Sequence, residues 1–327
     1  LFADVDYLAM HVAEGYGLLR VMDVNETPNA RDVVLYEALP NELPRVGGII
    51  TTAMQTPLSH VNLRAIQDNL PNAFIRDALH QAGIDTLIGK YVHYKVEQPN
   101  FTIRAATKTE VDAFYESRRP AKGQIPIRDL SKTKIKPLDS ISFAESASFG
   151  VKCANVATMR KFGFPQGTIP NGYGIPFYFY DEFMKYNGFY AKAQAMLADA
   201  SFQSDFNVQV QRLADFRKEV KDAPMPPWMM AELTTLQRSF PADTPIRCRS
   251  STNNEDLPGF SGAGLYDSKT QHPDEGHLSK SIKQVYASMW NFRAFDEREF
   301  YRIDHFVAAM GILVHPNHEN EKANGVG

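Results

Sequence analysis

The sequence predicts a mixed α/β protein made of two compact domains joined by a basic connector. Its 327 residues are enough for two domains. Short β-branched and aromatic runs alternate with amphipathic stretches throughout. From residue 118 to 136 seven of nineteen residues are Lys or Arg and one is Asp. We therefore expect domains at 1–117 and 141–327, with a solvated connector at 118–140.

The composition excludes several classes of protein. A hydrophobic content of 43% and a charged content of 22% are ordinary for a globular protein. The net charge of −3 gives no electrostatic case for nucleic acid, and no apolar run approaches the ~20 residues of a membrane span. Two cysteines do not make a disulfide framework, which favours a cytoplasmic protein. A first residue other than Met is compatible with a fragment of a longer protein.

In the first domain, residues 1–22 mix apolar and polar residues at roughly helical spacing and predict a helix. Runs rich in β-branched and aromatic residues predict strands at 31–39, 44–53, 91–96 and 101–106. Helices are expected at 61–70, ended by Pro71, and at 107–119, with a capping box formed by Thr109 and Asp112.

The second domain is expected to begin with a loop and helix at 148–163, ended by Gly163. A turn-rich segment that becomes strand-like follows at 167–180, and then come two helices, at 206–222 and 226–239. The remaining elements are a strand at 244–251, one long amphipathic helix at 278–302 and a strand at 304–316.

Three features of this domain suit phosphate binding, which uses backbone N–H groups, glycine-rich turns and fixed cations. Lys152 lies in a glycine-containing loop before a helix, Arg249 ends a strand, and "GFSGAGLYDS" has three closely spaced glycines. Each feature alone is also ordinary turn chemistry, but together they favour a phosphate site. Glu255 and Asp256 between them could bind Mg²⁺, orient Arg249 or cap a turn.

The stretch "RCRSSTNNEDLPGFSGAGLYDS" resembles the ATP-binding signature of the dikinase family, which includes pyruvate phosphate dikinase, phosphoenolpyruvate synthase and the glucan water dikinases. Residues 149–175 and 285–314 resemble the blocks that precede and follow it. The resemblance implies an ATP-grasp-like α+β domain, incomplete at its C-terminus. The residues it places against the nucleotide are Lys152, Arg249, Glu255, Gly262, Gly264 and Ser268. Val151 and Cys153 stand where the family has glycines around the lysine.

The stretch "TPLSHVNLRA" places His60 after a predicted buried strand and at the start of a helix. Locally, a core histidine, a metal ligand and a phosphoryl-carrying nucleophile all fit. The wider run "GGIITTAMQTPLSHVNLRAI" is similar to the family's swivelling β/β/α phosphohistidine domain, which implies that His60 is phosphorylated. A helix N-terminus favours an attached phosphoryl group, and Arg64, one turn on, could pair with it.

The resemblance implies an ATP-dependent phosphotransferase of the dikinase type. With Mg²⁺, the β-phosphoryl group of ATP would pass to His60 and on to an acceptor, either a small molecule such as pyruvate or a polysaccharide such as glucan. The chain ends where the family's closing ATP segment would start. Together with Val151 and Cys153, this leaves open a degenerate, non-catalytic nucleotide-binding or interaction module. Neither nucleic acid nor a membrane is expected as a partner.

Overall fold

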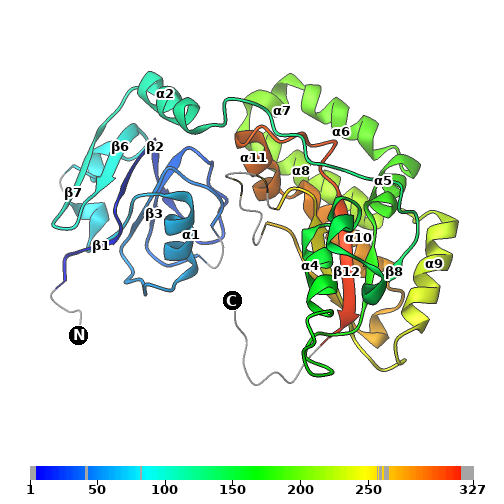
Figure 1. Cartoon of the computed structure of the whole chain (residues 1–327). Helices are drawn as coiled ribbons and strands as arrows, with labels where there is room; N and C mark the ends of the chain where they lie inside the picture. The colour runs from blue at the N-terminus through cyan, green and yellow to red at the C-terminus, as the bar shows by residue number, and fades with distance from the viewer. Residues whose placement is uncertain are drawn as a thin grey trace. The chain divides into compact units, whose positions relative to one another are not determined.

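The computed structural model describes residues 5–40, 43–81, 83–255, 257, 260 and 265–317. The chain forms two compact units, Leu1–Arg119 and Pro120–Gly327, and each is a mixed α/β structure with its own sheet (Figure 1). Within the described ranges no helix combines the length and apolar character needed to cross a membrane.

The first unit is built on a seven-stranded sheet of order β1-β5-β4-β3-β2-β6-β7. Its centre, from β2 to β5, is parallel, and β1, β6 and β7 pair antiparallel at the edges. The strands are β1 (Tyr7–His11), β2 (Ala13–Met22), β3 (Asp32–Tyr36), β4 (Gly48–Thr51), β5 (Asn72–Ile75), β6 (Tyr91–Val96) and β7 (Phe101–Ala105).

The expected helix over residues 1–22 is wrong, because β1 and β2 both lie in this segment. Burial alternates along the first part of β2, as it does in a strand, and its buried Leu19 and Met22 pack into the clusters on opposite faces of the sheet. Gly15 shows how closely two backbones pack in this strand, because a Cβ at Gly15 would lie 1.8 Å from the carbonyl oxygen of Gly47. A close approach of neighbouring backbones therefore requires glycine at this position.

The helices of the first unit are α1 (His60–Asp68) and α2 (Lys108–Arg118), with short 3₁₀ turns at Ala78–His80 and Asp85–Leu87. Val61 and Ala65 of α1 pack on one face of the sheet, and the 3₁₀ turns cover the other. The α2 capping box is formed by Thr107 and Glu110, not by Thr109 and Asp112 as expected. Thr107 is the residue that lies in extended backbone before the first helical turn, which is the position a capping side chain needs.

The second unit has a five-stranded antiparallel sheet of order β11-β10-β12-β9-β8. Its strands are β8 (Lys136–Pro137), β9 (Tyr173–Ile175), β10 (Ile246–Thr252), β11 (Lys269–Gln271) and β12 (Met310–Pro316). The helices are α3 (Ser146–Phe149), α4 (Val151–Met159), α5 (Phe177–Tyr186), α6 (Phe189–Ala198), α7 (Ala200–Ser204), α8 (Phe206–Asp222), α9 (Pro227–Arg238), α10 (Ser279–Ala287) and α11 (Phe292–Phe300). The remaining 3₁₀ turns are Leu138–Ser140, Phe143–Glu145, Pro273–Glu275 and Ser288–Trp290.

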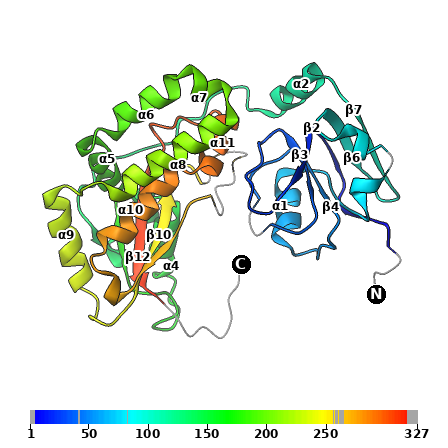
Figure 2. The same ribbon diagram turned by 180° about the vertical axis from the view of Figure 1, so that it is seen from behind.

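Helices cover both faces of this sheet (Figure 2). On one face α4 buries Cys153 and Ala157 against Leu313 of β12. On the other face the main core joins Ile246 and Cys248 of β10 to apolar residues of α5, α8, α9 and α10. The sheet thus holds β10 between two layers, with α4 on the face of Leu313.

Two sequence expectations for this unit are wrong. The "FYFY" run is the start of α5, not a strand, because Pro176 precedes it and Phe177, Tyr180 and Met184 are buried at helical spacing. The expected single helix at 278–302 is broken between α10 and α11. Asn291 there has extended backbone, and its Oδ1 accepts a 2.7 Å hydrogen bond from the Ala294 amide, which starts a new helix.

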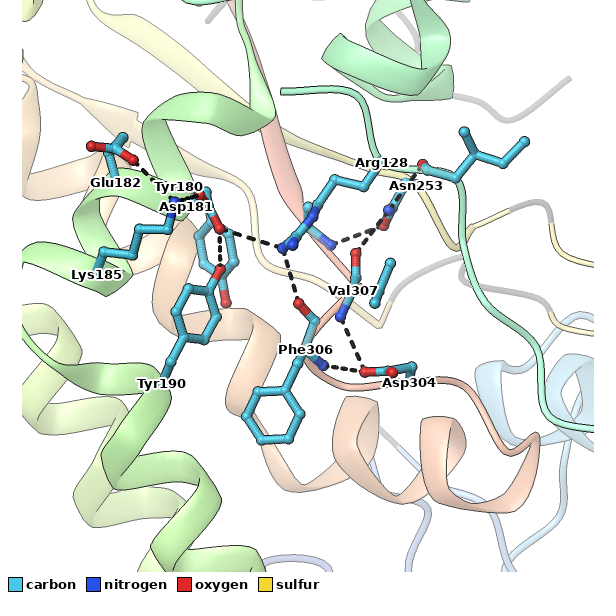
Figure 3. Close-up of polar contacts among 12 residues, drawn as sticks. Arg128, Tyr180, Asp181, Glu182, Lys185, Tyr190, Asn253, Asp304, Phe306 and Val307 are labelled. Carbon is cyan, nitrogen blue, oxygen red and sulfur yellow. Dashed lines mark hydrogen bonds and ion pairs between the residues drawn. The ribbon is translucent and has the colours of Figure 1, made fainter. Parts of the chain in front are cut away.

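Residues 120–140 fall within the second unit and are fixed to it by specific contacts. The Gln124 amide donates to the Arg302 carbonyl at 2.9 Å. Arg128 Nη1 donates to the Phe306 carbonyl at 2.9 Å and lies 3.4 Å from Oδ1 of buried Asp181 (Figure 3). Ser148 Oγ donates to Asp129 at 2.6 Å. Much of the segment expected to be a solvated connector is thereby anchored.

Candidate nucleotide and phosphohistidine sites

The candidate nucleotide site forms where the start of α4 meets β10. Gly150 precedes α4 with φ +82° and ψ 155°, and a Cβ there would lie 2.2 Å from the Ser251 carbonyl oxygen. The close approach lets the Cys153 amide donate to Ser251 Oγ at 2.9 Å. One amide of the first turn of α4 is therefore satisfied by β10, and the residue beside it, Lys152, is carried to the end of the strand.

Lys152 lies at the centre of the site. Its Nζ is 3.3 Å from Glu255 Oε1 and 3.5 Å from Ser250 Oγ. The lysine side chain is one-third exposed and that of Glu255 is largely buried. The structure therefore brings together two of the residues named from sequence, a lysine and a carboxylate on separate segments.

Arg249 precedes Ser250 on β10, and its side chain is exposed. Within the part of the chain that the structure describes, it makes no hydrogen bond or ion pair. Its strand partner Leu313 packs with Cys153, so Arg249 shares the sheet face covered by α4. Ser268 lies one residue beyond the Cys248–Lys269 pair, which puts it level with Arg249 in the antiparallel ladder. Gly262, Gly264 and Asp256 lie outside the described residues.

Buried hydrogen bonds hold the two ends of the glycine loop together. Asn254 Nδ2 donates to Tyr266 Oη at 2.7 Å, and both side chains are buried. Burial raises the pKa of Tyr266, so its hydroxyl keeps its proton at neutral pH. Arg298, fully buried, adds a 3.4 Å contact to the same oxygen. Sequence reasoning missed these three residues, because no local spacing pattern links positions so far apart.

Asn253, which precedes Asn254, fixes the chain just after β10 to neighbouring segments through three hydrogen bonds. Asn253 Nδ2 donates to the Val307 carbonyl at 3.0 Å and to the Ile127 carbonyl at 3.2 Å. Its Oδ1 accepts from the Ala309 amide at 2.9 Å. Figure 3 shows Asn253 beside Val307 and Arg128. The anchored 120–140 segment thus contacts the strand end from which the glycine loop departs.

Cys153, which stands where the family has a glycine, is part of a core and not of the candidate nucleotide site. Cys153 is fully buried in the small core between α4 and the sheet, where burial raises its thiol pKa to about 12. Cys248 is likewise buried on the opposite face, with a thiol pKa raised to about 12. Both thiols are free and inert as nucleophiles at neutral pH.

In the first unit, His60 is the first residue of α1 and is exposed. Ser59 caps the helix, with its Oγ accepting from the Asn62 amide at 3.2 Å. Arg64 is buried and its Nε lies 2.6 Å from Asp68 Oδ2, so this arginine already has a carboxylate partner. Arg64 is therefore paired with Asp68 and does not offer His60 a free positive charge.

A buried amide network, which sequence reasoning also missed, shapes the loop before His60. Gln55 and Asn72 exchange hydrogen bonds of 2.8 and 3.0 Å. Asn72 also donates to Asn62 Oδ1 at 3.1 Å, and Asn62 donates to the Pro57 carbonyl at 2.9 Å. These contacts join the loop to β5 and α1. No local pattern signalled this network, because Gln55 and Asn72 lie outside the elements expected from sequence.

Metal ligands are not gathered anywhere in the described ranges, where no three His, Cys, Asp or Glu side chains cluster as a metal site requires. The carboxylate of Glu255 lies beside Lys152, 3.3 Å from its Nζ.

Comparison with known proteins decides the family. Residues 146–327 match the family described as pyruvate phosphate dikinase, AMP/ATP-binding domain, which is more than half of the chain. The chain belongs to this family. The match to the pyruvate phosphate dikinase AMP/ATP-binding domain includes α4, β10, Lys152, Arg249 and Glu255, and it begins after the first unit, which holds His60.

Curated relatives of this AMP/ATP-binding domain protein are phosphoenolpyruvate synthases. A probable phosphoenolpyruvate synthase of Staphylothermus marinus is 27% identical over 184 residues, which is 54% of the chain and 22% of the relative. The Aeropyrum pernix phosphoenolpyruvate synthase is 26% identical over 182 residues, with the same coverage. That of Aquifex aeolicus is 26% identical over 194 residues, or 57% of the chain and 22% of the relative. The matched region thus spans about a fifth of these relatives.

Proposed function

We propose that this protein is an ATP-dependent phosphotransferase of the dikinase type. The observation that carries the proposal is the contact of Lys152 with Glu255 and with Ser250, which follows Arg249 on β10, within the region that matches an AMP/ATP-binding domain. The names of the curated relatives support the reaction class.

The phosphates of ATP would be held by the cations of α4 and β10. Lys152 would exchange its contact with Glu255 for a phosphate oxygen, and the exposed Arg249 guanidinium would contribute a bidentate contact. Gly262, Gly264 and Ser268 would line the remaining side. Mg²⁺ would offset phosphate charge and be held chiefly by the phosphates, with Glu255 as the candidate protein carboxylate.

His60 would be the first acceptor, in a unit proposed to be a swivelling phosphohistidine domain. A ring nitrogen bonds to the β-phosphorus of ATP, the bond to the α-phosphate bridging oxygen breaks, and AMP leaves with the electron pair. Water then releases the terminal phosphate. Support comes from the exposure of His60 at a helix N-terminus and from its apolar neighbour Leu58, which is 80% exposed and suits a docking surface.

The final acceptor is proposed to belong to the pyruvate or glucan class. The relatives' names favour pyruvate, and a histidine unit preceding the ATP unit favours the glucan order. Arg64 can stabilise phosphohistidine only by leaving Asp68, so its proposed role requires that ion pair to open.

The test is transfer of label from [β-³²P]ATP with Mg²⁺ to the full chain. We expect acid-labile, base-stable label on the protein, lost in His60→Ala and kept in His80→Ala, which removes another exposed histidine of the same unit. Label that persists in His60→Ala would contradict the proposal. ATP binding without any label would instead support the non-catalytic nucleotide-binding module.

A further inference from the structure

A cavity of about 510 Å³ lies in the second unit where the end of α9 meets the start of β10 and the end of β11. Its volume is that of a small-molecule site. Phe240, Pro241 and Ile246 give it apolar walls, and Arg238, Thr244 and Gln271 bring polar groups to it.

This cavity is separate from the candidate ATP site. Ile246 begins β10, whereas Arg249 and the residues that contact Lys152 belong to the far half of the strand. Ile246 and Cys248 also face the main core, while Arg249 shares its face with Leu313 and α4. The cavity and the candidate ATP site therefore lie at opposite ends of β10, and the Arg249 side chain lies on the sheet face opposite to Ile246.

Gln271, which lines the cavity, has a buried side-chain N–H group without a hydrogen-bond partner. The side chain is 2% exposed, and its Oε1 accepts from both the amide and the Oγ of Ser281, at 3.3 and 3.0 Å. Because an amide N–H can only donate, this contact fixes which end of the Gln271 amide is oxygen. Its Nε2 then has no hydrogen-bond partner in the described structure. A buried donor without a hydrogen-bond partner destabilises the protein, so an acceptor on a ligand would be favoured here.

A positive charge at the cavity is a second feature that favours an anionic ligand. Arg238 ends α9, is exposed, and makes no ion pair in the described parts of the chain. No carboxylate lines the cavity. A cation, a buried amide donor and apolar walls together select a ligand with an anionic, hydrogen-bond-accepting head and an apolar body.

We propose that this cavity is a binding site for a small organic carboxylate with an apolar or aromatic body. The carboxylate accepts from Gln271 Nε2 and pairs with Arg238, and the ring packs against Phe240 and Ile246. The site is independent of nucleotide binding and adds a second small molecule to those the protein recognises.

The experiment is a calorimetric titration of the full chain with 2-naphthoate, repeated with its neutral analogue 2-naphthamide and in saturating ATP. We expect saturable 2-naphthoate binding that ATP does not displace, and binding of the amide weaker by about tenfold, the loss of one charged contact. Arg238→Gln, a surface change, and Gln271→Met should each weaken 2-naphthoate by a similar factor, with circular dichroism confirming the fold.

Arg249→Gln, on the opposite sheet face, is the matched control and should leave 2-naphthoate affinity unchanged. Equal affinity for acid and amide, full affinity in Arg238→Gln, displacement by ATP, or no saturable binding to the folded protein would each overturn the proposal.

Discussion

Lys152 Nζ lies 3.3 Å from Glu255 Oε1, although 103 residues separate them in the chain. The lysine is carried by α4 and the glutamate follows β10, so the pair exists only because α4 packs at the strand end. A lysine ammonium that contacts one carboxylate can instead bind the phosphates of a nucleotide, which carry more negative charge. The geometry therefore favours an anion at this position.

Gly150 should be the most sensitive backbone position of the site. Its φ of +82° and ψ of 155° lie in a region essentially restricted to glycine, and a Cβ would overlap the Ser251 carbonyl. We expect Gly150→Ala to lower the free energy of unfolding by about 2–4 kcal/mol. Both tryptophans, Trp228 and Trp290, are in the second unit, so urea unfolding followed by tryptophan fluorescence measures this unit alone.

Gly163→Ala is the matched control for that substitution. Gly163 also has positive φ, +76°, but nothing lies within 4 Å of its would-be Cβ. Its cost should be only about 1 kcal/mol, from backbone strain. Equal losses in the two variants would show that the contact with Ser251 does not matter.

His305 should make the second unit less stable in mild acid. It is buried, its Nδ1 accepts from Arg298 Nε at 2.9 Å, and its Nε2 donates to Glu299 at 2.6 Å. Burial lowers its pKa below the usual value of 6.5, so the folded protein binds fewer protons than the unfolded chain. Stability should be constant above about pH 7 and fall as the pH drops through about 6.5 towards the lowered pKa.

The measurement is the free energy of unfolding at a series of pH values, for the wild type and His305→Gln. The variant should lose less stability between neutral and mildly acidic pH, because glutamine does not titrate. Parallel curves would assign the acid sensitivity to other groups, such as His277, whose pKa burial also lowers.

The contacts that fix the 120–140 segment predict which bonds of the chain between the two units trypsin cleaves first. Arg118 and Lys122 are exposed, whereas Arg128 is held by Asp181 and the Phe306 carbonyl (Figure 3). Limited trypsin digestion should cut first after Arg118 or Lys122 and leave Lys132 and Lys134 intact. Mass spectrometry of the earliest fragments identifies these sites.

Arg128→Gln should add early cuts after Lys132 or Lys134, because the segment loses its central anchor. The unit should stay folded, since Asp181 keeps Lys185 at 2.6 Å and the Tyr190 hydroxyl at 2.9 Å. An unchanged digestion pattern would mean that Arg128 does not hold the segment.

Sequence reasoning found the elements with strong local patterns. The run "TPIRCRSS" predicted a strand where β10 lies, and 206–222 and 226–239 predicted helices that match α8 and α9 closely. It failed where a distant contact overrides local spacing. Gly15 must pass close to Gly47, which makes a strand of a segment with helical spacing.

The candidate site likewise combines residues that a local motif predicts with contacts that no local motif predicts. Lys152 and Arg249 were proposed from their motifs, because phosphate-binding loops have short sequence signatures. The contact of Lys152 with Glu255 and the pairing of Asn254 with Tyr266 were not, because packing of separate segments creates both. The Arg64–Asp68 ion pair has the i,i+4 spacing that a helix brings together and could have been predicted, but Arg64 was expected to pair with the phosphoryl group instead.

The most direct test of the account is the affinity for ATP of two arginine variants on one strand. Arg249 is exposed and unpaired in the described structure, whereas Arg247, two residues earlier, donates to Thr270 Oγ1 at 3.0 Å. Calorimetric titration should show ATP binding weakened about tenfold or more by Arg249→Gln and little changed by Arg247→Gln. Equal effects of the two substitutions, or none from either, would contradict a phosphate site built on Lys152 and Arg249.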